Sequence, residues 1–416
     1  MFKFNKQFYR TIVPALLLIL LAACSSYTHQ PEPVDATAIF EQALLTATHA
    51  VLPTNVPTST MVPTSQPTLI AEPTLPQVNR IPPNLPPIYI SNLLNPLDYP
   101  HTYVDSTCEY LKNKWLPDKS KPGTVVMPIM FHSIIDGDAI QPDMITKQDF
   151  ELLMRSLHEQ NFIPISTKQL RDFLYDNAKI PERSMLLIVD DRHYADYFEV
   201  WFQPFMQEFS WDAPVINAWI SHPGTLAVVY DGNIRLNQQG LVDHQAHGVV
   251  HNINIQEWAS NTVIDTAIYG TVTAEQFVRN ELTGSIATIE EKFGTKPIAY
   301  IWPGGSFSLL GAQVGREVGY EMGFTINPRG PLMYNWIPLS DSADPRRPSY
   351  LPEGYINDPL MVLPRYWDTD ALYHIDTVRT IGKEYAAIAQ QQRDVELEYY
   401  DIVCSTEFGI FDSSVP

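Results

Sequence analysis

The chain has 416 residues, with 27 Lys and Arg against 47 Asp and Glu, and therefore a formal net charge of −20. Hydrophobic residues make up 45% of the chain and aromatic residues 11%, which is enough apolar material for a core and excludes global disorder. A chain this acidic lacks the basic surface that nucleic-acid phosphates require, so we expect no nucleic-acid partner.

Residues 1–23 have the pattern of an export signal. Three basic residues within the first ten precede an apolar run from Ile12 to Ala23, which is shorter than the roughly 20 apolar residues that span a bilayer. The run ends in Leu-Ala-Ala followed by Cys24, which resembles a bacterial lipobox. An ordinary signal peptide cleaved near Ala23 is the alternative. We expect Cys24 to be acylated, so that the protein is exported to the cell envelope and tethered by lipid, with its domain outside the cytoplasm.

Residues 24–100 are rich in Pro, Thr and Ser, and twelve of the 35 prolines lie between residues 51 and 100. Proline fixes φ and removes an amide donor, while Thr and Ser offer little apolar surface to bury. We therefore expect a disordered, extended linker over 24–100 and a folded domain over 101–416.

From residue 125 onward, apolar runs rich in β-branched residues alternate with segments of helical period. The expected strands are 125–131, 184–189, 214–220, 297–302 and, more weakly, 322–326. The expected helices are 147–160, 168–177, 197–209, 273–293 and 310–318. This alternation indicates an α/β fold in which helices cover a parallel sheet, either doubly wound or closed as a barrel.

Polar side chains follow the expected strands, at the edge where parallel α/β folds carry their functional residues. These residues are His132, Asp190, Asp191, His247, His251 and Gly304. Adjacent carboxylates at a buried strand end are costly unless a cation neutralises one of them. A spacing of four puts His247 and His251 on one face of a helical turn. Together with an Asp they make three ligands and leave a fourth position open, as in a catalytic zinc site.

Each pair alone is weak, because two adjacent Asp residues usually form a solvated turn and two His four apart are usually accidental. The segment His247–His251 also lacks the Glu that a zinc protease carries after its first His.

Taken in order, the segments resemble the polysaccharide deacetylases, also called NodB-homology or carbohydrate esterase family 4 enzymes. The family's first motif matches 188–193 (Ile-Val-Asp-Asp-Arg-His), and its second matches 240–251 with the two histidines. Its third matches 302–305 (Trp-Pro-Gly-Gly), followed by a Gly-Tyr strand at 319–325. Leu-Pro-Arg at 363–365 is similar to a late segment of the branch that acts on exopolysaccharides.

The resemblance implies a distorted (β/α) barrel that removes acetyl groups from an N-acetylated cell-wall or extracellular polysaccharide. It implies that Asp191, His247 and His251 hold a divalent metal, usually Zn²⁺, and that Asp190 is the general base. We expect a monomer.

The resemblance also gives roles to residues around the base. A backbone N–H at Gly304 would meet the oxyanion, and Arg365 would orient Asp190 or balance its charge. The departing amine needs a proton, and His132 and His374 are both candidates to donate it.

The chain departs from the family pattern at several positions. Arg192 stands where the family has Gly, Gly248 replaces a Ser or Thr, Gly304 replaces an aromatic residue, and the Arg usual before the third motif is missing. Two other functions therefore stay open. One is a degenerate barrel that binds glycan without hydrolysing it, and the other is a metal-dependent amidase or esterase with a non-sugar substrate. Four aromatic residues could line a glycan cleft or belong to the core: Trp302, Trp336, Tyr366 and Trp367.

Cys108 and Cys404 remain once Cys24 is acylated, and an even pair in an oxidising compartment favours a disulfide. The two bracket the expected barrel, whose first and last elements are neighbours. Two separate buried thiols are the alternative.

Overall fold

The computed structural model describes residues 80–252, 261–344 and 351–411. The expected signal peptide, the lipidation site Cys24 and most of the expected linker lie outside these residues. Within the described ranges, no helix is both long and apolar enough to cross a membrane.

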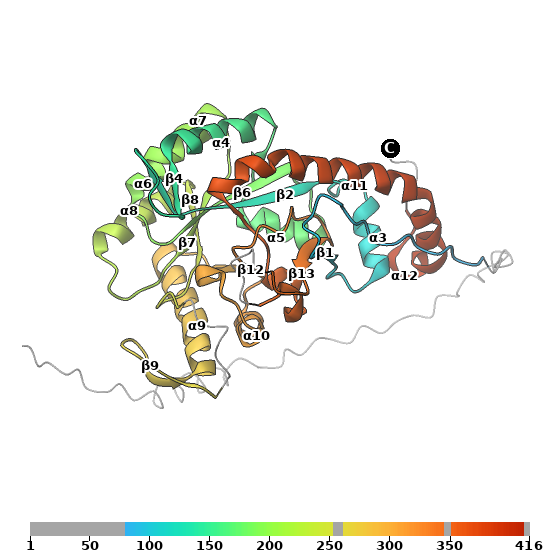
Figure 1. Cartoon of the computed structure of the whole chain (residues 1–416). Helices are drawn as coiled ribbons and strands as arrows, with labels where there is room; N and C mark the ends of the chain where they lie inside the picture. The colour runs from blue at the N-terminus through green and yellow to red at the C-terminus, as the bar shows by residue number, and fades with distance from the viewer. Residues whose placement is uncertain (1–79, 253–260, 345–350, 412–416) are drawn as a thin grey trace, which may run out of the picture. The chain divides into compact units, whose positions relative to one another are not determined.

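One parallel sheet of eight strands organises the domain (Figure 1). Its strands are β2 (Val125–Phe131), β5 (Ile163–Pro164), β6 (Arg183–Asp190), β7 (Val215–Trp219), β8 (Val242–Ala246), β11 (Ala299–Ile301), β12 (Met322–Phe324) and β14 (Tyr366–Trp367). They run in the order β12-β11-β8-β7-β6-β2-β14, with β5 beside the first half of β6. All seven residues of β2 are buried, as expected for a strand covered on both faces. The five strands expected from apolar runs are therefore confirmed.

The two edges of this sheet meet through one short segment. Leu363 pairs with Phe324 of β12 on one side, and three residues later Tyr366 pairs with Ile129 of β2 on the other. The amide of Leu363 donates to the carbonyl of Gly323 (2.7 Å). The sheet thus curls back on itself. The distorted (β/α) barrel is therefore confirmed, and the alternative of an open doubly wound sheet is not.

Helices cover the outside of the barrel. They are α4 (Lys147–Glu159), α5 (Thr167–Asp176), α6 (Ala195–Trp201), α7 (Gln203–Glu208), α8 (Ala227–Gln238), α9 (Ala274–Phe293) and α10 (Leu309–Val318). Helix α9 begins with a capping box between Thr273 and Gln276 and ends at Gly294 in the left-handed region, as the sequence predicts. The expected helix 197–209 is instead two helices, because Pro204 lies in the first turn of α7 and cannot donate an amide to α6.

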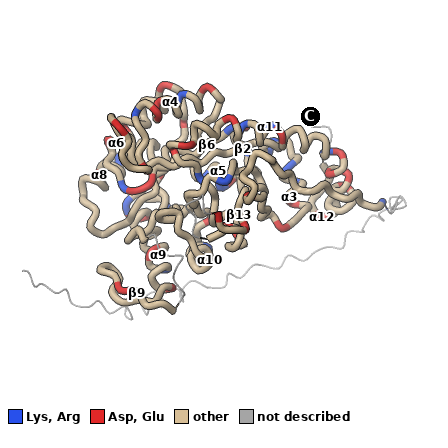
Figure 2. The backbone as a smooth tube through the Cα atoms, viewed as in Figure 1, with Lys and Arg blue, Asp and Glu red and all other residues tan. Residues whose placement is uncertain are grey.

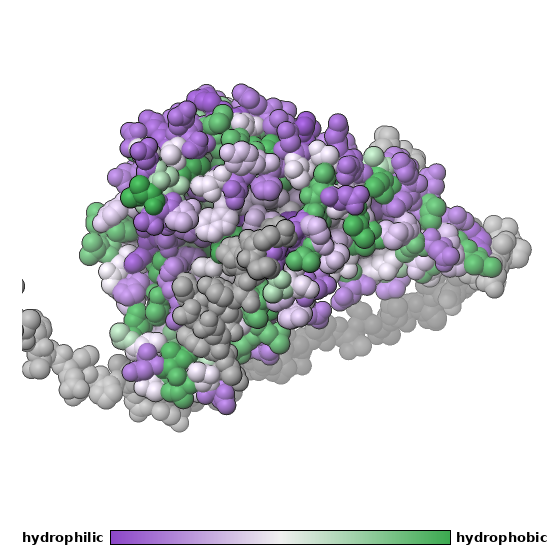
Figure 3. Space-filling view, viewed as in Figure 1, coloured by the Kyte–Doolittle hydropathy of each residue, from purple (hydrophilic) through white to green (hydrophobic). Residues whose placement is uncertain are grey.

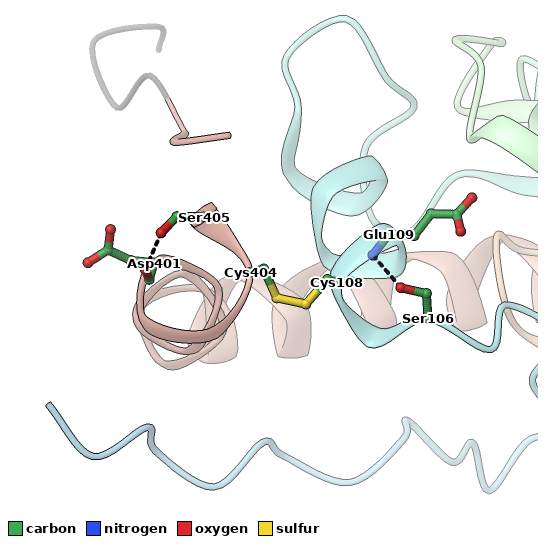
Figure 4. Close-up of a disulfide and its surroundings, with 6 residues drawn as sticks. All are labelled: Ser106, Cys108, Glu109, Asp401, Cys404 and Ser405. Atoms are coloured by element: carbon green, nitrogen blue, oxygen red, sulfur yellow. Dashed lines mark hydrogen bonds between the residues drawn. A yellow bond between two sulfur atoms is a disulfide. The ribbon is translucent and has the colours of Figure 1, made fainter. Parts of the chain in front are cut away.

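The longest helix, α11 (Asp368–Val403), follows the segment that closes the barrel and packs on α4 and β2 (Figure 1). It also contacts α3 (Thr107–Trp115) and α12 (Ser405–Phe408). Cys108 on α3 and Cys404 at the end of α11 form a disulfide, with Cα atoms 5.3 Å apart (Figure 4).

The described residues also form three separate two-stranded sheets and three 3₁₀ turns. The pairs are β1 (Asp98–His101) with β13 (Ile337–Ser340), β3 (Ser133–Ile135) with β4 (Met144–Thr146), and β9 (Val263–Thr266) with β10 (Gly270–Thr273). The 3₁₀ turns are η2 (Pro303–Gly305), η3 (Glu353–Ile356) and η4 (Pro359–Met361). Tyr89 is buried and its carbonyl accepts from the indole of Trp336 (2.8 Å), so the packed part of the domain begins before residue 101.

The described surface is mixed in charge and in polarity. In the view of Figure 2, Lys and Arg are interspersed with Asp and Glu along the helices. The space-filling view shows hydrophilic residues over α4 and small separate hydrophobic patches (Figure 3).

Candidate metal and catalytic site

Asp191, His247 and His251 converge at the carboxyl edge of the sheet. Asp191 follows β6 directly, and His247 follows β8. The Nε2 atoms of the two histidines are 3.1 Å apart, and Oδ1 of Asp191 is 3.9 Å from Nε2 of His247 and 3.5 Å from Nε2 of His251. The three ligand atoms therefore form one cluster.

This donor set fits a zinc-class ion. Nδ1 of His247 lies 2.7 Å from the carbonyl of Ile301, which can only accept, so Nδ1 carries the proton and Nε2 presents a lone pair to the cluster. Burial lowers the pKa of His247 to about 4, which keeps the imidazole neutral as a ligand must be. Two nitrogens bound to a tetrahedral zinc ion are about 3.4 Å apart, close to the separation seen here.

The expectation that His247 and His251 share a helical turn is wrong. Strand β8 ends at Ala246, and the chain then turns through left-handed conformations at Gly248 (φ +83°) and His251 (φ +56°). A helix cannot include such residues, so a tight irregular loop brings the two Nε2 atoms together.

Asp190 ends β6 and is buried, and Arg365 pairs with both of its oxygens. Nη1 of Arg365 donates to Oδ1 (2.6 Å) and Nη2 donates to Oδ2 (2.9 Å). Burial acts to raise the pKa of Asp190, but Arg365 together with the nearby imidazoles of His247 and His132 outweighs it and holds this pKa well below its usual range. Nε of Arg365 donates to the carbonyl of Thr325 (2.7 Å), which fixes the guanidinium in the barrel.

The adjacent carboxylates lie in different surroundings. Asp191 has φ +70° and a side chain 43% exposed, whereas Asp190 is 2% exposed. The buried amide of Asn217 on β7 donates to the carbonyls of Val189 (3.0 Å) and Asp191 (2.7 Å) and so holds this turn. Sequence reasoning missed Asn217, although a polar residue within an otherwise apolar strand was the available signal.

His132 lies beside the carboxylate of Asp190. Its Nε2 is 3.7 Å from Oδ2 of Asp190, and its ring stacks on Trp367 with centroids 5.7 Å apart. His374 is on α11 and lies against Tyr366, with ring centroids 5.1 Å apart. The geometry therefore favours His132 of the two candidate proton donors.

Gly304 lies in η2, after β11, and is exposed with φ +59°. An aromatic residue would be strained in this conformation, which accounts for the departure from the family pattern. The role of its amide in binding an oxyanion stays a prediction.

Three of the four aromatic residues considered for a glycan cleft are core residues. Trp302, Trp336 and Tyr366 are buried, so that interpretation is wrong for them. Trp367 is partly exposed and, through its stacking on His132, borders the site.

Arg192, which follows Asp191 in the chain, borders a surface cavity. Its guanidinium donates to the hydroxyl of Thr225, in the loop between β7 and α8. The cavity measures about 230 Å³ and is also lined by Tyr194 and Leu226.

No family model matches the chain. The chain is 21% identical over 238 residues to the poly-beta-1,6-N-acetyl-D-glucosamine N-deacetylase of Escherichia coli O157:H7, covering 51% of this chain and 35% of that protein. It is 22% identical over 226 residues to "Putative polysaccharide deacetylase YxkH" of Bacillus subtilis, covering 54% and 70%. A solved structure, the Streptococcus pyogenes deacetylase PplD in complex with acetate, aligns at a TM-score of 0.44 and 14% identity over 61% of this chain and 98% of that one.

The chain thus spans about a third of the length of the Escherichia coli protein and about two thirds of the Bacillus subtilis protein. The names of both proteins describe polysaccharide deacetylation. The motifs that carry the resemblance meet at one edge of the barrel, where a three-donor cluster lies beside a carboxylate held by an arginine. The described domain is accordingly similar in sequence to polysaccharide deacetylases, and its parallel sheet curls into an α/β barrel.

Proposed function

We propose that the protein is a metal-dependent hydrolase that removes N-acetyl groups from a cell-wall or extracellular polysaccharide. The observation that carries the proposal is that two adjacent carboxylates have different partners. Asp191 joins His247 and His251 in a partly exposed cluster, while Asp190 is set apart by its pairing with Arg365.

A zinc-class ion held by Asp191, His247 and His251 would supply Lewis acidity to the acetyl carbonyl. In the proposed reaction, water adds to that carbonyl, the C–N bond breaks, and acetate and a free amine leave. Asp190 is ionised and accepts the proton of the attacking water. His132 donates a proton to the departing nitrogen from the same side of the site, since its Nε2 lies 3.7 Å from Oδ2 of Asp190.

The pairing with Arg365 gives this base a specific property. Two hydrogen bonds stabilise the ionised form of Asp190, so its carboxylate is present at neutral pH even though it is buried. The same bonds fix the plane of the carboxylate. Asp190 thereby accepts a proton in a defined direction and does not need to reorganise.

Acetate release by the full mature protein tests this function. We expect zinc-loaded protein to release acetate from N-acetylglucosamine oligomers and Asp190→Asn to retain zinc but lose at least 10²-fold in kcat, because an amide cannot accept the proton. The exposed Asp212→Asn is the matched control and should keep the parent rate. Binding of the oligomer without acetate release would favour a glycan-binding protein that does not hydrolyse its ligand. Hydrolysis of non-sugar amides or esters alone would favour an amidase or esterase.

We also propose that the protein is a lipid-anchored lipoprotein of the cell envelope, as Cys24 at the end of the apolar run suggests. A disulfide between Cys108 and Cys404 is compatible with export, because disulfides persist in oxidising compartments. Cys24→Ala should abolish labelling by radioactive fatty acid and release the protein from the membrane fraction. Retention in that fraction without labelling would contradict the proposed anchor.

A further inference from the structure

A buried carboxylate reaches the loop that carries His251 from a distant helix. Glu281 lies on α9 and is only 2% exposed. Its Oε2 accepts the amide N–H of Val249 (2.9 Å), and both of its oxygens lie 3.0 Å from the amide nitrogen of Val250. The hydroxyl of Tyr269 donates to Oε1 (2.8 Å). Glu281 therefore accepts hydrogen bonds from two consecutive amides, of which that of Val249 is buried and would be costly to leave unpaired.

The carboxylate also explains the glycine at position 248. A Cβ placed on Gly248 would come within 2.7 Å of Oε2 of Glu281 and 3.1 Å of the hydroxyl of Tyr300. Gly248 further has φ +83°, which disfavours any side chain. The family pattern has a Ser or Thr at this position, so here the carboxylate of a residue 33 positions later fills the space that a side chain at 248 would need.

We propose that Glu281 is a positioning residue that holds the loop 248–251 in the conformation needed for metal binding, and that Tyr269 orients Glu281. The inference rests on the proposed metal-dependent function. His251 is itself left-handed (φ +56°), a conformation that costs free energy in a non-glycine residue and persists only when the surroundings enforce it. The hydrogen bonds from the amides of Val249 and Val250 to the buried Glu281 can enforce it, because a buried polar group left unpaired is costly.

The two histidines are held in position by different partners. His247 is fixed through its own Nδ1, which donates to the carbonyl of Ile301 (2.7 Å). His251 follows the loop that Glu281 holds by its backbone. Loss of Glu281 should therefore misplace His251 while His247 stays in position. Outer groups of this kind typically contribute 10- to 100-fold to metal affinity.

The test uses the full mature protein and Co²⁺ as a spectroscopic probe. In Glu281→Gln an NH₂ group replaces one carboxylate oxygen, so one acceptor oxygen remains where the loop amides and the Tyr269 hydroxyl had two. We expect the Co²⁺ dissociation constant to rise 10- to 100-fold and the visible Co²⁺ absorption bands to weaken and shift. Glu290→Gln is the matched control, because Glu290 is exposed on the same helix. Its Co²⁺ affinity and spectrum should equal those of the parent.

A second readout requires no metal. Hydrogen exchange of the amides at 249 and 250 should accelerate at least tenfold in metal-free Glu281→Gln and stay unchanged in Glu290→Gln. Tyr269→Phe, which removes a single hydroxyl, should change both readouts in the same direction by a smaller factor, and it decides the matter if Glu281→Gln does not fold. Parent-like Co²⁺ affinity and exchange in these variants would overturn the positioning role. A different result is that the parent protein binds no Co²⁺ while Glu281→Gln still accelerates exchange at 249 and 250. That result would overturn the metal-dependent function and the metal-binding part of this inference, and only the support of the loop by Glu281 would remain.

Discussion

Arg365 donates hydrogen bonds to both carboxylate oxygens of Asp190, a residue 175 positions earlier in the chain. Both side chains are buried, so neither charge is screened by water. Arg365 belongs to the segment that joins the edges of the sheet between Leu363 and Tyr366. The segment that closes the barrel therefore also carries the arginine that helps to keep the proposed base ionised.

Removal of Arg365 should destabilise the domain as well as inactivate it. Arg365→Gln leaves Asp190 buried without its counter-charge, which typically costs about 3–5 kcal/mol in the free energy of unfolding. Urea unfolding monitored by circular dichroism measures this cost. The double variant Arg365→Gln, Asp190→Asn should recover part of the lost stability and none of the activity, whereas equal stability of the single and double variants would contradict the charge argument.

The metal prediction concerns stoichiometry. The mature protein should carry about one zinc-class ion, and His247→Ala should lower its affinity strongly because two remaining ligands rarely hold zinc. Inductively coupled plasma mass spectrometry after dialysis gives the ratio of metal to protein. His158→Ala, at an exposed position on α4, is the control. Protein that stays metal-free after zinc loading would exclude the proposed ligand set.

The two candidate proton donors can be separated by rate. His132→Gln should reduce kcat by 10²- to 10⁴-fold, because a general acid contributes on that scale and Nε2 of His132 lies next to Asp190. His374→Gln should stay within a few-fold of the parent, and both variants should bind the same amount of zinc. The opposite order of rates on an N-acetylglucosamine oligomer would assign the donor role to His374.

Stability should fall as the pH is lowered, partly through His244. Burial lowers the pKa of this imidazole to about 3, from 6.5 in an unfolded chain. Between these values the unfolded state binds more protons than the folded state, so stability increases with pH across that window and decreases on acidification. From pH 7.5 to pH 5 this one group should cost about 2 kcal/mol in the free energy of unfolding.

His244→Phe should reduce that pH dependence while keeping the ring contact with Phe293. Urea unfolding at the two pH values measures the difference, and the exposed His158→Gln serves as control. An unchanged pH dependence in His244→Phe would show that the buried imidazole is not its source.

The disulfide predicts how many free thiols the unfolded protein shows before and after reduction. Mature protein unfolded without reductant should show no reactive thiol from Cys108 or Cys404, and two after reduction. Two thiols before reduction would contradict the bond.

The sequence predicts best those elements whose environment is uniform along their length. Strand β2 was predicted with its observed bounds because both of its faces are buried, and α9 because Thr273 and Gly294 mark its ends. Helix α8 was missed, since Gly232 interrupts its pattern. Helix α11 was missed because the residue before its first turn, Trp367, makes no capping hydrogen bond that would mark its start.

At the site, the identity of the residues was easier to predict than their conformation. Adjacent carboxylates and two histidines were visible in the sequence, and the structure brings three of these residues together. The loop conformation between His247 and His251 was predicted wrongly, because it depends on Glu281, which lies 30 residues further along the chain. Local spacing holds no information about such a contact.

The bond between Cys108 and Cys404 has a consequence for proteolysis. The two cysteines are 296 residues apart, and every residue of the proposed site lies between them. A single cut in any loop inside that interval would leave one covalent molecule, whose two pieces stay joined at α3 and the end of α11 (Figure 4). Such a nicked protein would migrate as a single intact chain on a non-reducing gel and as two fragments after reduction.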